Sequence, residues 1–320
     1  MNLSKILAIL VSIFTLFFFY KCIPTRGETV RKSSSQGEAG YVGNEVCAGC
    51  HEDTAGSFME SYHGVAFKNG EISCESCHGP GGKHVNSQDP ADIINFSGKT
   101  NVDLMHYSSI CFKCHKRTKG VMAWSGSIHY QAGLSCTTCH KVHVSASEKI
   151  KRSASRPFKT SVETFFLKES DPELCYSCHK NMKARVLYPS HHPVNEGKMK
   201  CSDCHNPHGS IVGMLKTDER LNDICYKCHP DKQGPYAFEH PPVVEDCTIC
   251  HEPHGTVAYN LLKRTEPFLC LQCHHSHFQT YEHKDFQYVV SVRCTQCHVA
   301  VHGSNHPAQG APMGGKALTR

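Results

Sequence analysis

Residues 201–208 read CSDCHNPH, and this stretch decides the fold of the chain. It holds two cysteines separated by two residues, a histidine directly after the second cysteine, and another histidine three residues further on. The Cys-x-x-Cys-His part occurs ten times, and 20 of the 21 cysteines lie in it, which leaves only Cys22 outside. In such a motif both thiols add across the vinyl groups of a porphyrin and the histidine binds the iron. Each copy therefore predicts one covalently attached haem c.

The ten motifs predict ten haems per chain. The expected attachment residues are Cys47, Cys50, Cys74, Cys77, Cys111, Cys114, Cys136, Cys139, Cys175, Cys178, Cys201, Cys204, Cys225, Cys228, Cys247, Cys250, Cys270, Cys273, Cys294 and Cys297. The expected proximal iron ligands are His51, His78, His115, His140, His179, His205, His229, His251, His274 and His298.

Two other uses of paired cysteines fit this pattern less well. Zinc ribbons hold a tetrahedral ion with Cys-x-x-Cys units, and disulfide frameworks cross-link such cysteines, but neither requires a histidine after every second cysteine. All ten motifs carry that histidine. The sequence therefore favours haem over zinc and over disulfides.

Taken in pairs, the motifs form five two-haem repeats, at residues 47–84, 111–143, 175–208, 225–254 and 270–302. A further histidine follows each even-numbered motif, namely His84, His143, His208, His254 and His302, with His306 as a competitor at the last position. Another histidine precedes each even-numbered motif: His63, His129, His192, His240, and either His277 or His283, which spacing alone does not separate. These ten positions are the predicted distal iron ligands.

Two histidines for each of ten irons predict that every iron is six-coordinate. The rest of the 25 histidines, which include His106, His191 and His275, are expected to be surface or supporting residues. Methionine is the competing sixth ligand, but the eight methionines do not follow the repeat. An iron with both axial positions filled by protein does not readily bind a substrate. The sequence thus predicts an electron carrier with no catalytic residues, and not an enzyme.

The N-terminal residues predict export. Lys5 precedes an apolar run at residues 6–20, ILAILVSIFTLFFFY, which is shorter than the roughly 20 residues of a bilayer span. Residues 1–22 are therefore expected to be a signal peptide or, because no Ala-x-Ala site follows, an N-terminal anchor. Lipidation of Cys22 is disfavoured by the large residues before it. Residues 23–40 are expected to be a flexible tether, 41–310 the decahaem domain, and 311–320 a C-terminal tail.

Composition predicts that the cofactors supply the core. Aromatic residues make up 9% of the chain and only one is tryptophan, Trp124. The formal charge of +5 becomes about −5 with ten ferric haems of about −1 each, so lysines and arginines are expected to face haem propionates, and no nucleic-acid partner is expected. The expected fold class is an elongated multihaem cytochrome c, with loops and short helices around a continuous haem row and little or no β-sheet. Inserts near 85–108 and 144–170 are expected to be surface loops.

The chain from Cys201 onward resembles the MtrA/PioA/DmsE family of decahaem c-type cytochromes. The resemblance rests on CSDCHNPHGS, CYKCHPDKQGP, EHPPVVEDCTICHEPHG and VHGSNHP, and upstream CESCHGPGGKH and AWSGSIHY look like the first half of the same family. It covers roughly residues 41–310. At residues 277–281, HFQTY, the resemblance favours His277 over His283.

The resemblance implies a function and partners. Family members are periplasm-facing electron wires held inside a β-barrel porin of the outer membrane. They connect periplasmic or inner-membrane cytochromes to an extracellular multihaem cytochrome, a metal oxide, iron or a soluble partner. The direction of electron flow stays open, because members of the family work both ways. The implied location is the periplasm, in association with the outer membrane.

Three other functions compete with that of a conduit. A soluble periplasmic shuttle feeding a reductase would have the same haem ligation. A multihaem reductase would need one iron without a distal histidine, and a cytochrome filament would borrow ligands from neighbouring chains. Because the chain has a surplus of histidines, the sequence favours the conduit over the reductase and the filament.

Overall fold

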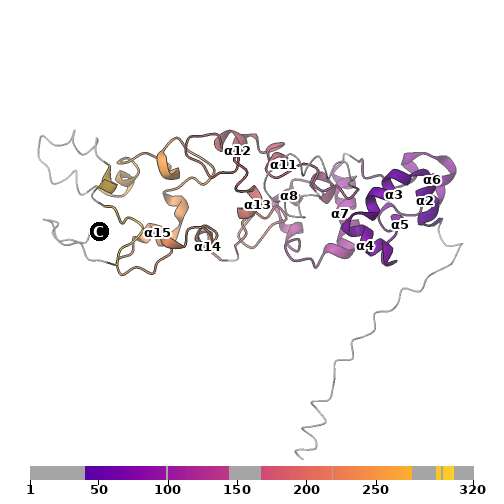
Figure 1. Ribbon diagram of the computed structural model, residues 1–320, viewed down its shortest axis with the longest axis horizontal. Coiled ribbons are helices and arrows are strands. Elements are labelled where there is room, and N and C mark those ends of the chain that lie inside the picture. Colours follow the sequence, from indigo (N-terminus) through magenta and orange to yellow (C-terminus); the bar gives the residue numbers. More distant parts are fainter. Residues whose placement is uncertain are drawn as a thin grey trace, which may run out of the picture.

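The computed structural model describes residues 40–98, 100–143, 167–217, 219–275, 293–296 and 298–305. These residues form a rod, and the chain runs along the rod in sequence order, from α2 at one end to α15 near the other (Figure 1). The five repeats therefore follow one another along a single axis. The predicted elongated shape is confirmed. The predictions for residues 1–22, 23–39 and 311–320 and for Cys297, His277, His283 and His306 lie outside the described residues.

The described helices are short, and every motif has its first cysteine inside one of them. They are α2 (Asn44–Cys50), α3 (Glu52–Met59), α4 (Tyr62–Lys68), α5 (Cys74–His78), α6 (Gly82–Ser87), η1 (Pro90–Asp92), α7 (Asn101–His115), η2 (Trp124–Gly126), α8 (Ile128–Gln131), α9 (Cys136–Cys139), α11 (Glu173–Tyr176), α12 (Lys180–Arg185), α13 (Cys201–Cys204), α14 (Leu221–Tyr226), η4 (Pro230–Lys232), α15 (Pro241–Glu245), η5 (Cys247–Ile249), η6 (Tyr259–Leu261), η7 (Cys270–Gln272) and η8 (Cys294–Gln296).

The motif helices begin at polar residues that satisfy their first backbone N–H groups. Ser73 precedes α5 and its hydroxyl accepts a hydrogen bond from the N–H of Ser76, at 3.1 Å. At the start of α13, the side chain of Asp203 accepts one from the N–H of Lys200, at 2.8 Å. These are N-terminal capping contacts, and they explain how a helix of one turn can form where the motif requires it.

In the described part of the chain, β-structure is limited to isolated bridges. Three of them are equivalent and join the histidine of an even-numbered motif to a later leucine: His140 to Leu167, His205 to Leu215, and His251 to Leu262. In each case the lysine after the leucine donates its N–H to the carbonyl of the motif's second cysteine, at 2.8 Å. The predicted fold class of helices and loops with little or no sheet is confirmed.

The insert near 85–108 was expected to be a surface loop, and this expectation is wrong for part of it. The 15-residue helix α7 begins at Asn101 and continues into the third motif. Thr100 caps it by accepting the N–H of Asp103 at 3.2 Å, and Tyr107 and Ile110 are buried on its inner side. Capping and burial together make helix more favourable than loop. Most of the second insert lies outside the described residues.

Among the residues that the structure describes, the protein's own hydrophobic core is small. The buried apolar side chains are Phe58, Tyr107, Ile110, Trp124, Tyr176, Val186, Ile224 and Ala258, spread along the whole rod. A chain of this length normally buries far more apolar surface in one contiguous cluster. Within the described ranges, the model contains no helix with the length and apolarity needed to traverse a bilayer.

Candidate haem-binding cavity

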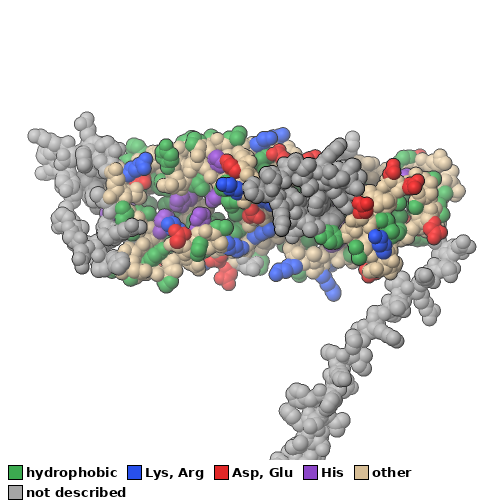
Figure 2. Space-filling model, in the orientation of Figure 1, with side chains coloured by type: hydrophobic (Ala, Val, Ile, Leu, Met, Phe, Trp, Pro, Cys, Tyr) green, Lys and Arg blue, Asp and Glu red, His purple; other side chains and the backbone are tan. Residues whose placement is uncertain are grey.

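A single continuous cavity of about 5430 Å³ runs through the rod. An ordinary small-molecule pocket measures roughly 300–1,000 Å³, so this cavity is several times larger than one ligand needs. All ten predicted proximal histidines line it, together with the predicted distal histidines His63, His84, His129, His143, His192, His208, His240, His254 and His302. In the space-filling view, histidines are visible at the bottom of an opening in the C-terminal half (Figure 2).

The structure brings these histidines together in pairs, each with one predicted proximal and one predicted distal residue. The pairs are His51–His84, His63–His115, His78–His143, His129–His179, His140–His208, His192–His229, His205–His254, His240–His274 and His251–His302, with ring centroids 5.8 to 6.3 Å apart. Two metal–imidazole bonds of about 2 Å and the distances from ring nitrogen to ring centre add to roughly 6 Å. The spacing therefore fits an iron between each pair of rings.

Most pairs join two neighbouring repeats. His63 of the first repeat faces His115 of the second, while His143 of the second faces His78 of the first. The same exchange joins each later repeat to the next, whereas His51 and His84 lie in one repeat. Among the described residues, only this pair at the N-terminal end does not cross between repeats. The repeats are thus interlocked and not self-contained.

Backbone carbonyls orient several of the distal rings. The Nδ1 atom of His129 lies 3.0 Å from the carbonyl oxygen of Pro207, and that of His192 lies 2.8 Å from the carbonyl oxygen of Pro253. Both carbonyls belong to the residue directly before another distal histidine. A hydrogen bond at Nδ1 fixes the tautomer and leaves Nε2 as the free lone pair, which is the arrangement of a metal-binding imidazole.

Burial favours the neutral form of several of the paired imidazoles. Burial and, to a lesser extent, the charge of the facing His140 together lower the pKa of His208 to about 4. Burial likewise lowers the pKa of His205, His251 and His302. Only the neutral ring has a lone pair to donate to iron, so the cavity favours the ligating form.

Glycines that follow distal histidines allow close approach between repeats. Gly255, directly after His254, has φ +144°, and a Cβ there would lie 2.1 Å from the carbonyl oxygen of Arg185. Gly303, directly after His302, has φ +134° and leaves equally little space beside Tyr236. A residue with a side chain would strain the backbone and push the neighbouring repeat away.

The motif cysteines are arranged so that consecutive motifs are neighbours. Within a repeat, the two first cysteines lie together: a hydrogen bond from Cys111 lowers the pKa of the Cys136 thiol to about 6, and the Cys175 and Cys201 sulfurs lie within 4.8 Å of each other. Between repeats, burial raises the pKa of the second thiol of four even-numbered motifs, and a cysteine of the next repeat also raises it. Cys114 acts on Cys77, Cys175 and Cys178 act on Cys139, Cys228 acts on Cys204, and Cys273 acts on Cys250. The motifs are therefore ordered in space as they are in sequence.

One supporting feature was missed in the sequence. A Leu-Lys pair occurs at residues 167–168, 215–216 and 262–263, and its backbone closes each even-numbered motif of the second, third and fourth repeats. The dipeptide follows the motif by a variable distance, so its place in the repeat is hidden until the chain is folded. A comparison of the residues that follow the distal histidine in each repeat could have found the dipeptide.

Comparison with known proteins gives the same picture. Residues 191–234 and 240–279 match the model of the doubled CXXCH motif, and residues 74–164 match that of the NrfB-like cytochrome c-type proteins. The chain is also 34% identical to "Multiheme cytochrome MtrA" of Shewanella baltica (strain OS185) over 310 residues, which cover 91% of this chain and 86% of that relative. Identity over nearly the whole chain, together with ten haem c attachment motifs, shows that it belongs to the MtrA family of multihaem c-type cytochromes, which are electron-transfer proteins.

Proposed function

We propose that the protein holds ten haems, each between two histidines, and conducts electrons across the outer membrane inside a β-barrel porin. It would connect periplasmic or inner-membrane cytochromes with extracellular acceptors or donors. The observation that carries the proposal is the chain of histidine pairs that follows the rod in sequence order.

The residues of this chain attach and orient the cofactors. Each motif would hold one haem through its two cysteines, and the nine histidine pairs given above would supply both axial ligands. His298 would hold the tenth iron with His277, which the family resemblance favours over His283. When bound, each haem supplies a one-electron ferric/ferrous couple. Because the chain fills both axial positions, it leaves no open iron for a substrate, and the proposed role is non-catalytic.

The arrangement of the motifs supports conduction of electrons along the rod over storage of electrons in separate haems. Motifs adjacent in sequence are adjacent in space through their cysteines, and the first and last described motifs lie at opposite ends of the rod (Figure 1). Electrons entering at one end would thus have one route to the other.

The porin, the extracellular multihaem cytochrome and the periplasmic location are proposed from similarity. The relative that covers most of the chain is an MtrA cytochrome, and the family resemblance described above implies those partners. A second candidate, a soluble periplasmic electron shuttle, is favoured by the match of residues 74–164 to NrfB-like cytochromes. The two functions share haem ligation and differ in what surrounds the rod.

Purification from the native membrane tests the choice. Outer membranes would be solubilised in mild detergent, and the haem-stained complex isolated through a tag on this chain. The conduit predicts a stable complex with a β-barrel protein that survives high salt, and transfer of electrons to an acceptor enclosed in liposomes carrying the complex. Recovery of the whole population as a free monomer in the periplasmic fraction would favour the shuttle.

A further inference from the structure

In every repeat, one side chain links the two haem-attachment segments. It lies three or four residues before the first cysteine of the odd-numbered motif and accepts a hydrogen bond from a backbone N–H at the start of the even-numbered motif. The five bridging residues are Asn44 (from Cys74 N, 2.9 Å), Ser108 (from Cys136 N, 3.4 Å), Asp171 (from Cys201 N, 3.0 Å), Asn222 (from Cys247 N, 2.7 Å) and Glu266 (from Thr295 N, 2.9 Å).

The bridging residues are placed to fix geometry. Ser108 and Asn222 are 1% exposed and Asp171 is 5% exposed. Each bridge satisfies a donor at the start of a short helix, which the helix itself cannot satisfy, and it spans between 25 and 30 residues of sequence. The bridge therefore ties the second attachment segment of a repeat directly to the first.

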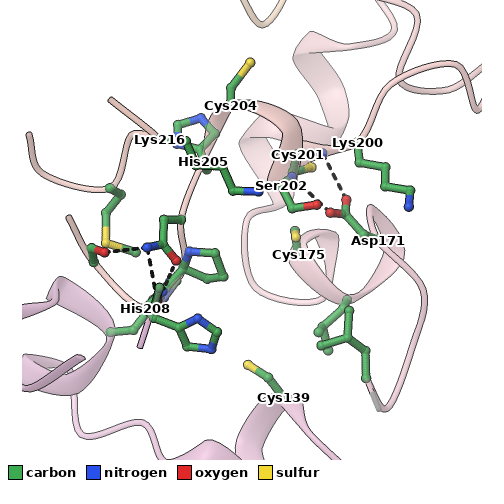
Figure 3. A pocket seen from close by; sticks show the side chains of 18 of the residues that line it. Cys139, Asp171, Cys175, Lys200, Cys201, Ser202, Cys204, His205, His208 and Lys216 are labelled. Carbon is green, nitrogen blue, oxygen red and sulfur yellow. Dashed lines mark hydrogen bonds between the residues drawn. The ribbon is translucent and has the colours of Figure 1, made fainter. Parts of the chain in front are cut away.

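Two of the bridging residues also bring a negative charge to the junction. The Asp171 carboxylate accepts from the N–H groups of Cys201 and Ser202, both at 3.0 Å (Figure 3). Its oxygen lies within 4.8 Å of the sulfur atoms of Cys175 and Cys201, and Glu266 has the same relation to Cys270 and Cys294. In the other three repeats the bridging side chain is neutral, although in the first repeat the buried Glu75 carboxylate makes a second link by accepting from the N–H groups of Val42 and Gly43, both at 3.0 Å.

We infer that the five bridging residues are positioning residues that fix the position of the two haem sites of each repeat relative to each other. Asp171 and Glu266 also lower the reduction potential of the sites they join. This inference rests on the proposed binding of haem at every motif. A negative charge close to a haem site disfavours the addition of an electron there, so the carboxylates of the buried Asp171 and the partly exposed Glu266 stabilise the oxidised state.

Glu266 allows the charge and the bridge to be tested separately. Its carboxylate accepts from the N–H of Thr295 at 2.9 Å and from the hydroxyl of Thr295 at 3.0 Å. In Glu266→Gln the amide oxygen can keep the first contact, and the amide NH₂ can donate to the hydroxyl in the second. The glutamine variant thus removes the charge while the bridge remains, whereas Glu266→Ala removes both.

The experiment is a spectroelectrochemical titration of the full-length holoprotein, together with its haem content and thermal midpoint. Glu266→Gln should keep the wild-type haem content and thermal midpoint. The two haems of the repeat account for about a fifth of the titration, and this part should move to higher potential. The equilibrium constant for their reduction should rise about tenfold, which is about 59 mV for a one-electron couple. Glu266→Ala should show the same shift and, in addition, a lower midpoint or incomplete haem attachment in that repeat. Glu173→Gln is the control, because Glu173 lies two residues before Cys175 in the sequence but its side chain is 57% exposed and pairs with Lys183, so the curve should stay unchanged.

Two results would overturn the inference. One is a Glu266→Gln titration that superimposes on the wild type while all ten haems stay bound and low-spin. The other is a Glu266→Ala protein with unaltered haem content and thermal midpoint, which would remove the positioning role. Failure of the proposed function looks different, because the wild-type protein itself would then carry fewer haems or a high-spin iron.

Discussion

The rings of His63 and His115 face each other with centroids 5.9 Å apart and an interplanar angle of 86°. His63 belongs to the first repeat and His115 to the second, so the contact joins two units that the sequence presents as separate. The same exchange recurs along the rod. Because these pairs would let each repeat complete the haem sites of its neighbours, the repeats are expected to fold as one cooperative unit once the cofactors are attached.

Replacing His63 should open the iron held by the third motif. His63→Ala removes one axial imidazole but no attachment cysteine, so we expect ten haems per chain and one of them high-spin. The reduction potential of that haem should rise, because the second imidazole favours ferric iron. Electron paramagnetic resonance of the oxidised protein measures the spin state.

The motif served by His63 can be identified with a second variant. Adding Cys111→Ala and Cys114→Ala to His63→Ala removes the haem of the third motif, and the high-spin signal should disappear with it. A high-spin signal that persists in this triple variant would place His63 on another iron. His106→Ala is the matched control, since His106 is exposed on α7 and should leave the spectrum unaltered.

Replacing His240 by methionine should affect a haem near the C-terminal end. His240 faces His274 of the ninth motif, with ring centroids 6.0 Å apart, and its Nδ1 lies 3.0 Å from the carbonyl oxygen of Val301. Thioether ligation raises the potential relative to imidazole, so one of ten haems should titrate at clearly higher potential with all ten retained. A titration identical to the wild type would remove His240 from the ligand set.

The orientation of paired rings predicts two spectroscopic classes of low-spin haem. The pairs His140–His208, His205–His254 and His251–His302 are nearly parallel, with interplanar angles of 11°, 14° and 12°. Parallel imidazoles on ferric haem give rhombic resonance spectra, while the 86° pair should give a single large-g signal. That large-g signal should vanish in His63→Ala, and a uniform rhombic spectrum in the native protein would contradict the ring geometry.

The sequence predicted the fold class and the family, and both are confirmed. The prediction was possible because covalent haem attachment requires a local Cys-x-x-Cys-His motif, which is visible in the sequence. It did not indicate which distal histidine faces which motif, since exchange between repeats depends on how the chain folds back in space. The bridging residues were also missed. Their identity varies among Asn, Ser, Asp and Glu, and their register shifts by one residue, so only their shared backbone partner defines them. Helix α7 was not predicted from the motif spacing, because its stability depends on the cap at Thr100 and on the burial of Tyr107 and Ile110.

Replacing Gly255 should destabilise the rod at the contact between the third and fourth repeats. In Gly255→Ala the new Cβ would lie 2.1 Å from the carbonyl oxygen of Arg185, at a φ of +144° that alanine rarely adopts. We expect a loss of about 2 kcal/mol or more, seen as a lower thermal midpoint by circular dichroism. Gly56→Ala is the control, because that helical position has open space and alanine should stabilise it slightly. Equal midpoints for the two variants would contradict the close contact.

The central claim is that ten motifs and twenty histidines hold ten irons with no open coordination site. The most direct test is haem quantification per polypeptide on the purified native protein, combined with its spin state and its reaction with carbon monoxide after reduction. The account predicts ten haems per chain, all low-spin, with no carbon monoxide bound while the protein is folded. Fewer than ten haems, or an iron that binds carbon monoxide in the native state, would contradict it.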